Sequence, residues 1–211
     1  MATSATGIIL AGGHSRRMGM DKAFVLFDGR TLIERTMDAL RQVCGEIVIV
    51  ANDLAPYTRF DARIVPDTIP GFGPLAGLHA GLEAMRTDLG VAVAVDMPFL
   101  SPALLRAMID AAEGWDAVIP ALAAEVSAAD VKRYRAKDLD IHPLHAVYRR
   151  TCLPMIQAAI DRDDRRLNAF LPDARVRYLY ADEIRVHDSD LRSLVNVNTP
   201  DDLEQVSRLR A

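Results

Sequence analysis

The stretch from Thr6 to Lys22, TGIILAGGHSRRMGMDK, joins a short apolar run to a glycine turn and then to three cations. Residues 8–10 predict a buried β-strand, and the Gly12-Gly13 pair predicts a tight turn directly after it. Free backbone amides in such a turn bind phosphate oxygens by direction, while cationic side chains offset the charge. We therefore interpret this stretch as a phosphate loop that follows the first strand of an α/β sheet.

Two common phosphate loops do not fit the pattern. A Walker A loop needs its lysine directly after the second glycine, followed by Ser or Thr. The dinucleotide fingerprint needs a glycine spacing that Gly12, Gly13 and Gly19 do not provide. The stretch therefore indicates a third kind of phosphate loop, which supplies cations from the loop itself.

Length and composition point to one globular domain over residues 1–211, long enough to bury a sizeable core. The net charge of −4 argues against a general nucleic-acid binder. Cys44 and Cys152 are far apart in the sequence, which is typical of reduced thiols in a cytosolic protein. Neither a signal peptide nor a membrane-spanning stretch is recognisable. We expect a soluble, cytoplasmic protein without membrane or nucleic-acid partners.

Short β-branched runs alternate with stretches of helical periodicity along the first half of the chain. Continuous apolar runs are typical of strands buried on both faces of a parallel sheet. The alternation predicts a doubly wound, mostly parallel sheet between two helical layers, a three-layer α/β/α arrangement. The expected strands are residues 8–10, 46–50, 63–65, 91–95 and 116–119, and the expected helices are 31–43, 75–86 and 102–112.

Local signals refine these expectations. Thr31 with Glu34 predicts a capping box, Ser101 before Pro102 an N-cap, and 28–29 (Asp-Gly) a hairpin turn. After Pro120 the pattern weakens, and we expect a surface excursion over residues 121–141, either helical or mobile. Beyond it we expect strands at 145–149 and 175–180, a helix at 152–160, and a stretch at 194–198 leading to a last helix capped by Thr199.

Polar residues follow several of the expected strands. Because ligands bind outside the carboxyl ends of parallel strands, these residues predict a shared site. Asp96 is the most informative, since it comes directly after five small apolar residues at 91–95. Burying a carboxylate at that position costs free energy unless it is paired or bound to a metal. Mg²⁺ prefers such oxygen ligands. The alternative is an aspartate that only caps the following turn. The residues at strand ends are Asn52, Asp67, Asp96, Asn196 and Asn198.

Other positions have ordinary alternatives beside a functional one. Lys22 and the Arg16-Arg17 pair are either phosphate ligands or solvated side chains. The glycines at 71, 73 and 77 either punctuate turns or let the backbone approach a base or ribose. His142 and His145 lack a matching Cys or His pair for zinc, so a satisfied histidine at a strand start or a wall of the acceptor pocket is the better interpretation.

Five motifs, in order along nearly the whole chain, resemble the molybdenum cofactor guanylyltransferase family. They are LAGGHSRRMGMDK from Leu10, GPLAGL from Gly73, VDMP from Val95, HPLHAVYR from His142 and VNVNTPDDL from Val195. The resemblance implies a Rossmann-like nucleotidyltransferase domain. It also implies transfer of GMP from GTP to the terminal phosphate of molybdenum-molybdopterin, with release of pyrophosphate.

The resemblance further implies roles for matching residues. Arg17, Lys22 and Asp96 would be catalytic, with Asp96 also holding Mg²⁺, and Asn196 and Asn198 would close the site near the acceptor. GTP and molybdopterin would be the substrates. Protein partners would be other molybdenum cofactor biosynthesis or acceptor proteins, with the chain a monomer or weak homo-oligomer. The nucleotide-binding residues would be Leu10, Ala11, Gly12, Gly13, Lys22, Asn52, Asp67 and Asp96.

Two alternatives stay open at this point. Relatives that transfer CMP usually read LAAG where this chain reads LAGG, and the additional glycine removes a methyl group where a purine needs room, which favours GTP over CTP. Sugar-phosphate nucleotidyltransferases share LAGG but continue differently and run longer. The other alternative is a non-catalytic nucleotide or cofactor carrier with the same fold, which has little need for both Lys22 and Asp96.

Overall fold

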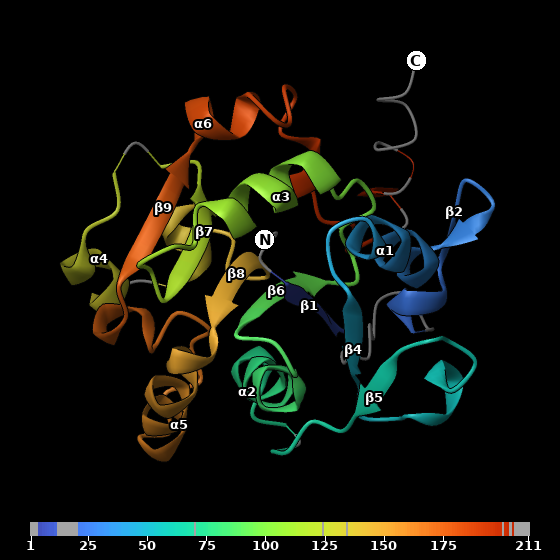
Figure 1. The fold of residues 1–211 in the computed structure, drawn as a ribbon, viewed down its shortest axis with the longest axis horizontal. Helices are drawn as coiled ribbons and strands as arrows, with labels where there is room; N and C mark the ends of the chain where they lie inside the picture. Colours follow the sequence, from blue (N-terminus) through green and yellow to red (C-terminus); the bar gives the residue numbers. More distant parts are fainter. Residues whose placement is uncertain are drawn as a thin grey trace.

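The computed structural model describes residues 4–11, 21–69, 71–123, 125–133, 135–199, 201, 202 and 204. A seven-stranded sheet runs through the middle of the molecule in the order β5-β4-β1-β6-β8-β7-β9 (Figure 1). Its strands are β1 (Ala5–Leu10), β4 (Glu46–Val50), β5 (Arg63–Val65), β6 (Leu89–Ala94), β7 (Ala117–Ala121), β8 (His145–Arg149) and β9 (Val176–Tyr180). A separate hairpin pairs β2 (Leu26–Phe27) with β3 (Arg30–Thr31). Among the described helices, none is both long and apolar enough to cross a membrane.

The strand order places a switch of direction beside β1. β1 pairs in parallel with β4 on one side and with β6 on the other, so Leu10 lies opposite both Val50 and Ala94. The chain first runs outward from β1 to β4 and β5, and then returns to form β6. Ligands of open α/β sheets bind at such a switch point, outside the carboxyl ends of the strands. The mostly parallel sheet is confirmed; β8 alone runs antiparallel, to both β6 and β7.

Helices cover both faces of the sheet, which confirms the three-layer prediction. α1 (Leu32–Arg41), α3 (Pro102–Asp110) and α6 (Ala181–Arg185) pack on the face that presents Ile9 and Ile49. α2 (Pro74–Ala84), α4 (Ala128–Arg133) and α5 (Leu153–Asp161) share the opposite face, which presents Ile8 and Val48. In Figure 1, α3 and α6 lie above the sheet and α2 and α5 below it. Every residue of β1 is buried, as expected for a strand between two layers.

Six short 3₁₀ helices connect these elements. They are η1 (Lys22–Phe24), η2 (Ala55–Tyr57), η3 (Ala136–Leu139), η4 (Arg150–Cys152), η5 (Leu171–Asp173) and η6 (Arg192–Leu194). α4 and η3 lie within residues 121–141, so the helical alternative for this excursion is the one the structure shows. β7 continues as far as Ala121, two residues beyond the expected end of that strand.

The predicted capping signals are confirmed. Thr31 Oγ1 accepts the N–H of Glu34 at 3.4 Å, and Glu34 Oε2 accepts the N–H of Thr31 at 2.8 Å. Ser101 Oγ accepts the N–H of Leu104 at 3.2 Å at the start of α3. The Asp28-Gly29 turn joins β2 to β3, with both residues at positive φ. These bonds satisfy amide groups that a helix leaves without intrahelical partners.

Glycines let α2 pack directly on β1. A Cβ on Gly81 would lie 2.3 Å from Ile8 Cγ2, and one on Gly77 would lie 3.1 Å from Leu10 Cδ2. Gly77 therefore serves close packing inside a helix, and its interpretation as turn punctuation is wrong. Gly71 and Gly73 do lie in the turn before α2, with φ of +81° and +111°, which glycine adopts without strain.

The last predicted strand end is absent. Residues 195–198 belong to none of the strands of the sheet, so Asn196 and Asn198 do not end a strand. The N–H of Val197 instead donates to the carbonyl oxygen of Asp96 at 2.8 Å. This bond brings the segment to the end of β6 without adding it to the sheet.

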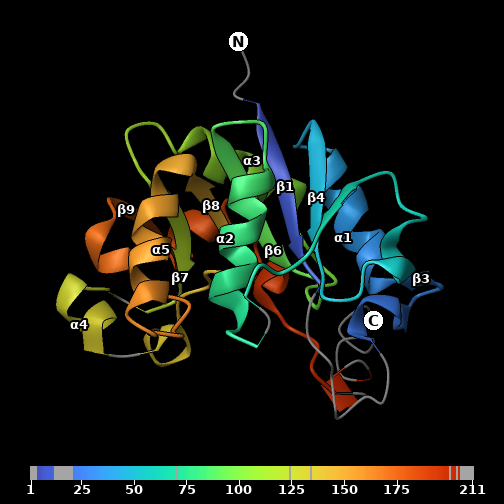
Figure 2. The same cartoon turned by 90° about the horizontal axis from the view of Figure 1, so that it is seen from below.

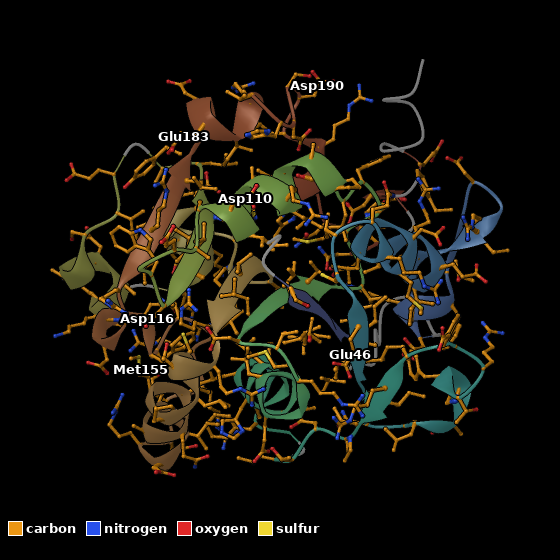
Figure 3. All side chains as sticks on the ribbon, in the orientation of Figure 1. Glu46, Asp110, Asp116, Met155, Glu183 and Asp190 are labelled. Atoms are coloured by element: carbon orange, nitrogen blue, oxygen red, sulfur yellow. The ribbon has the colours of Figure 1, made fainter. Side chains whose placement is uncertain are left out.

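Asp116 is a buried carboxylate at the amino end of β7 (Figure 3). Its Oδ2 accepts Nε and the backbone N–H of Arg175, both at 3.0 Å, and its Oδ1 accepts the Thr151 hydroxyl at 2.7 Å. The hydrogen bonds from the Arg175 guanidinium, outweighing the effect of burial, hold the pKa of the Asp116 carboxyl well below its usual range. The ionised form therefore stabilises the contact between β7, η4 and the start of β9.

We expect Asp116→Asn to lower the free energy of unfolding at pH 7 by about 1.5–3 kcal/mol, the scale of hydrogen bonds to a charged group. Because the folded pKa is depressed, this stabilisation is present above the unfolded pKa, near 4, and is lost as pH falls below it. Urea unfolding at pH 7, 4 and 3 should show that the difference in free energy of unfolding between variant and wild type becomes smaller as the pH falls. Asp110→Asn, at an exposed position, is the control. A gap that stays constant down to pH 3 would contradict this assignment.

Candidate functional site

The carboxyl ends of β1, β4, β5 and β6 meet at one edge of the sheet. In Figure 2 β1 runs downward from the N-terminus, so this edge faces the bottom of the view. Ala11, Asn52, Asp67 and Asp96 each come one or two residues after one of these strands. Asn52, Asp67 and Asp96, which were expected at strand ends, therefore follow strands that end at this edge.

Three of the predicted residues come together next to the switch point. Lys22 Nζ lies 3.1 Å from Asp96 Oδ2 and donates to Asn198 Oδ1 at 2.7 Å. The side chains of Lys22 and Asp96 are only 18% and 16% exposed. We call this group the Lys22–Asp96–Asn198 cluster. It joins the beginning, the middle and the end of the chain.

The second oxygen of Asp96 has no partner. Asp96 Oδ1 is buried and accepts no hydrogen bond from any residue that the structure describes. An orphaned carboxylate oxygen is costly, and a hard cation would satisfy it. The described residues contain no group of three or more His, Cys, Asp or Glu side chains able to hold a metal. A cation on Asp96 would therefore take further oxygen ligands from phosphates or water, as Mg²⁺-type sites do.

Asp202 holds Asn198 in place. Its Oδ2 accepts the N–H of Asn198 at 2.7 Å and that of Thr199 at 2.8 Å, while the Asp202 N–H donates to Thr199 Oγ1 at 3.1 Å. These bonds, led by the one from Asn198, lower the pKa of the Asp202 carboxyl. Thr199 is thus a helix cap, as predicted, and the cap fixes the backbone that carries Asn198.

The other predicted residues lie apart from this cluster. Asn52 and Asn196 are exposed, and Asp67 Oδ1 accepts the N–H of Ile69 within its own turn, at 3.0 Å. Within the described part of the chain, no hydrogen bond or ion pair joins any of these three to Lys22 or Asp96. Asn52 and Asp67 follow strands that end at the same edge of the sheet as the cluster.

The phosphate loop is only partly visible. Gly12, Gly13 and Arg17 lie outside the described residues, and Leu10 and Ala11 are the last ones before that gap. Leu10 is buried, and its side chain packs with the α2 side of the core. Ala11 is also buried, and its N–H donates to the carbonyl oxygen of Val50 at 2.9 Å. The two residues that precede the loop are therefore held by burial and by a hydrogen bond to the end of β4.

The two histidines lie at the start of β8, where the N–H of His145 donates to the His142 carbonyl oxygen at 3.0 Å. His145 begins β8 and is fully buried, with Nδ1 at 3.1 Å from the Ser193 carbonyl oxygen and Nε2 without a partner among the described residues. Burial lowers its pKa to about 4, so it is neutral at physiological pH. His142 Nε2 lies 3.9 Å from Asp140 Oδ1, and burial lowers its pKa as well. His145 therefore lies at a strand start, as expected, but only Nδ1 is satisfied within the described part of the chain.

Sequence reasoning missed Tyr57 and Asp21. The Tyr57 hydroxyl donates to Asp21 Oδ2 at 2.7 Å, directly beside Lys22. Their separation of 36 residues hides the pair from any local pattern. One signal was available, because a buried tyrosine usually finds a hydrogen-bond partner.

Comparison with known proteins places the chain in a family. A family model described as "MobA-like NTP transferase domain" matches residues 7–178. The chain is 36% identical to the molybdenum cofactor guanylyltransferase of Desulfosudis oleivorans, over 96% of this chain and 94% of that protein. It is 35% identical to a probable molybdenum cofactor guanylyltransferase of Pelotomaculum thermopropionicum, over 94% and 90% of the two chains.

Solved structures agree with this assignment. Molybdopterin-guanine dinucleotide biosynthesis protein A from Archaeoglobus fulgidus is 29% identical, with a TM-score of 0.78 over 97% of this chain and 98% of that one. The 2-C-methyl-D-erythritol 4-phosphate cytidylyltransferase of Thermus thermophilus shares the fold at 21% identity, with a TM-score of 0.67 over the full length of both chains. Sequence similarity over nearly the whole chain thus coincides with the nucleotidyltransferase fold and a polar cluster at its switch point. The chain belongs to the molybdenum cofactor guanylyltransferase family.

Proposed function

We propose that this chain transfers GMP from GTP to the terminal phosphate of molybdenum-molybdopterin, forming the guanine dinucleotide cofactor and pyrophosphate. Membership of the family over nearly the whole chain supports this function. The observation that carries it is the Asp96 carboxylate, with one oxygen on Lys22 and the other buried without a hydrogen-bond partner among the residues that the structure describes. That pairing of a cation with a free anionic ligand suits a nucleotide polyphosphate bound together with a metal.

The chemistry needs no strong base. An oxygen of the acceptor phosphate, already an anion, forms a bond to the α-phosphorus of GTP. The bond from that phosphorus to the oxygen bridging to the β-phosphate breaks, and its electron pair leaves with pyrophosphate. Catalysis then rests on alignment and on neutralising the charge of the α-phosphate and the leaving group. The cluster offers groups for charge neutralisation, which agrees with this requirement.

We assign the residues accordingly. Lys22 and Arg17 neutralise the phosphates, and Asn52 and Asp67 hold the base or sugar. Asn196 and Asn198 close the site toward the acceptor. Asp96 holds Mg²⁺, which supplies Lewis-acid stabilisation of the phosphate charge when bound. Leu10, Ala11, Gly12 and Gly13 line the guanine and ribose side of the nucleotide.

The two oxygens of Asp96 differ in their surroundings. Oδ2 accepts a hydrogen bond from Lys22 Nζ, while Oδ1 accepts none from the described residues. A cation would take Oδ1 as a ligand while Lys22 kept Oδ2. When bound, it would add its positive charge to that of the Lys22 ammonium in neutralising the phosphates.

Nucleotide choice and turnover are tested together. Purified protein with Mg²⁺ and molybdate-loaded molybdopterin is given each of the four nucleoside triphosphates separately, and pyrophosphate release is measured. We expect release with GTP alone. Release with CTP and not GTP would replace the proposed activity by cytidylyl transfer. Tight GTP binding without release from any nucleotide would indicate a carrier.

The two cysteines bear on the compartment in which we propose that the chain acts. Cys44 and Cys152 are free and buried, and burial raises the pKa of each thiol to about 12. Such thiols are poorly reactive and suit a reducing compartment. We assign the chain to the cytoplasm, as a monomer or weak homo-oligomer that exchanges the cofactor with other molybdenum cofactor proteins.

A further inference from the structure

We infer that Tyr57 is a positioning residue that holds η1 so that the Lys22 ammonium is aimed at the Asp96 carboxylate. The inference rests on the proposed function, because it assigns Tyr57 a part in the same reaction. Tyr57 is the last residue of η2 and is 1% exposed. Tyr57 acts through its hydrogen bond to Asp21, and the inference assigns it no contact with a substrate.

The hydroxyl of Tyr57 fixes the beginning of η1. It donates to Asp21 Oδ2 at 2.7 Å, while Asp21 Oδ1 accepts the N–H of Ala23 at 3.0 Å. Asp21 is thus the N-cap of η1, and Lys22 is the first residue of that helix. A carboxylate held at both oxygens has a fixed orientation, so the backbone of Lys22 is fixed as well.

The ring of Tyr57 fixes the end of the same helix. It packs against Phe24, the last residue of η1, with ring centroids 5.3 Å apart at an interplanar angle of 40°. A helix of three residues has too few internal hydrogen bonds to hold its own orientation. One side chain therefore contacts both the cap and the last residue of the element that presents Lys22.

The Tyr57 hydroxyl also lies close to the sheet. Its oxygen is 3.3 Å from the carbonyl oxygen of Ala11, whose N–H donates to the Val50 carbonyl oxygen. A hydroxyl has one hydrogen, and the shorter contact assigns it to the Asp21 carboxylate. Burial and the bond to Asp21 raise the pKa of Tyr57 well above its ordinary value. The hydroxyl is therefore protonated, and able to donate, at neutral pH.

A purely structural role for Tyr57 predicts different behaviour. If the ring only filled space, phenylalanine would replace it at a cost in stability alone. The contacts of Lys22, at 3.1 Å to Asp96 and 2.7 Å to Asn198, instead depend on where η1 lies. A shift of that helix by about 1 Å would take both contacts beyond hydrogen-bond length. Loss of the hydroxyl should therefore appear in catalysis.

The test is Tyr57→Phe in the full chain, with Tyr148→Phe as its matched control. The Tyr148 hydroxyl is equally buried and donates to the Pro143 carbonyl oxygen at 2.7 Å, away from η1. We expect Tyr57→Phe to lower kcat roughly tenfold, the loss of one hydrogen bond to a charged group, with KM for GTP changed by less than about threefold. Both variants should lose similar thermal stability, and Tyr148→Phe should keep the wild-type kcat.

A double-mutant cycle separates positioning from general destabilisation. In the Lys22→Ala background, Tyr57→Phe should lower kcat by less than about twofold, because the group it positions is gone. A Tyr57→Phe variant within threefold of wild type would overturn the inference. The same tenfold loss in both backgrounds would overturn it too.

Failure of the proposed function gives a different result. Wild-type protein that binds GTP without transferring it to molybdopterin would refute the function and leave the positioning role measurable from structure. Crystal structures of the wild type and of Tyr57→Phe should then show Lys22 Nζ displaced from Asp96 Oδ2 and Asn198 Oδ1 in the variant. Unchanged Lys22 contacts in Tyr57→Phe would refute the positioning role as well.

Discussion

Replacing Asp96 by alanine is expected to lower turnover by a factor on the order of a thousand, while GTP affinity falls by only about tenfold. The substitution removes the carboxylate that pairs with Lys22 at 3.1 Å, which is the metal ligand in the proposed mechanism. The proposal assigns the base and ribose to other residues, so we expect part of the affinity to remain. The loss therefore falls mainly on the step in which charge moves onto pyrophosphate.

Pyrophosphate release and GTP titration measure the two effects separately. Asp53→Asn is a suitable control, because Asp53 is an exposed carboxylate after β4 whose Oδ1 only accepts the N–H of Ala55 at 3.1 Å. Asparagine keeps that bond, so turnover should be unchanged. Asp96→Ala with wild-type turnover would rule out Asp96 as the metal ligand.

Replacing Lys22 by alanine is expected to lower kcat/KM for GTP by about a hundredfold, the usual scale for one charge-stabilising group at a reacting phosphate. The ammonium would be lost from Asp96 and from Asn198 at the same time. Lys22→Arg should recover only part of the activity, since a planar guanidinium does not replace a compact ammonium in so tight a contact.

The control for Lys22 removes a positive charge at the opposite edge of the sheet. Arg86 precedes β6, is 77% exposed and lies 3.8 Å from Glu46, the first residue of β4 and labelled in Figure 3. Arg86→Ala should leave kcat/KM unchanged. If Lys22→Ala behaved like Arg86→Ala, Lys22 would be a solvated lysine with no part in the reaction.

The layers of the fold were predictable from local patterns. Apolar runs predicted the strands, and the Thr31–Glu34 and Ser101 caps predicted the starts of two helices. Both kinds of signal depend only on residues that are neighbours in the sequence. The direction of β8 was not predictable. Its buried residues read the same whether the strand runs parallel or antiparallel to β6, and only the connections through residues 121–144 decide between the two.

The site was predictable only where a residue carries a signal in its own stretch of sequence. Lys22 and Asp96 each carry a local signal, a glycine loop and a strand end, and the structure places them in contact. Asn198 was expected at a strand end and instead lies in a segment bonded to Asp96 through Val197. Tyr57 has no local signal that identifies its partner, since Asp21 is distant in sequence and Tyr57 lies in the short 3₁₀ helix η2.

The hydrogen bond from Val197 to Asp96 has a consequence for the order in which the protein matures. A chain emerging from the ribosome folds from its N-terminus, so the sheet can assemble once β9 has been made. Asn198 comes after β9, which ends at Tyr180, so it reaches Lys22 only after the segment that follows β9 has left the ribosome. A nascent chain, or one truncated after β9, would thus carry the sheet without the complete cluster. The site is therefore assembled after the sheet, by a segment that adds no strand to it.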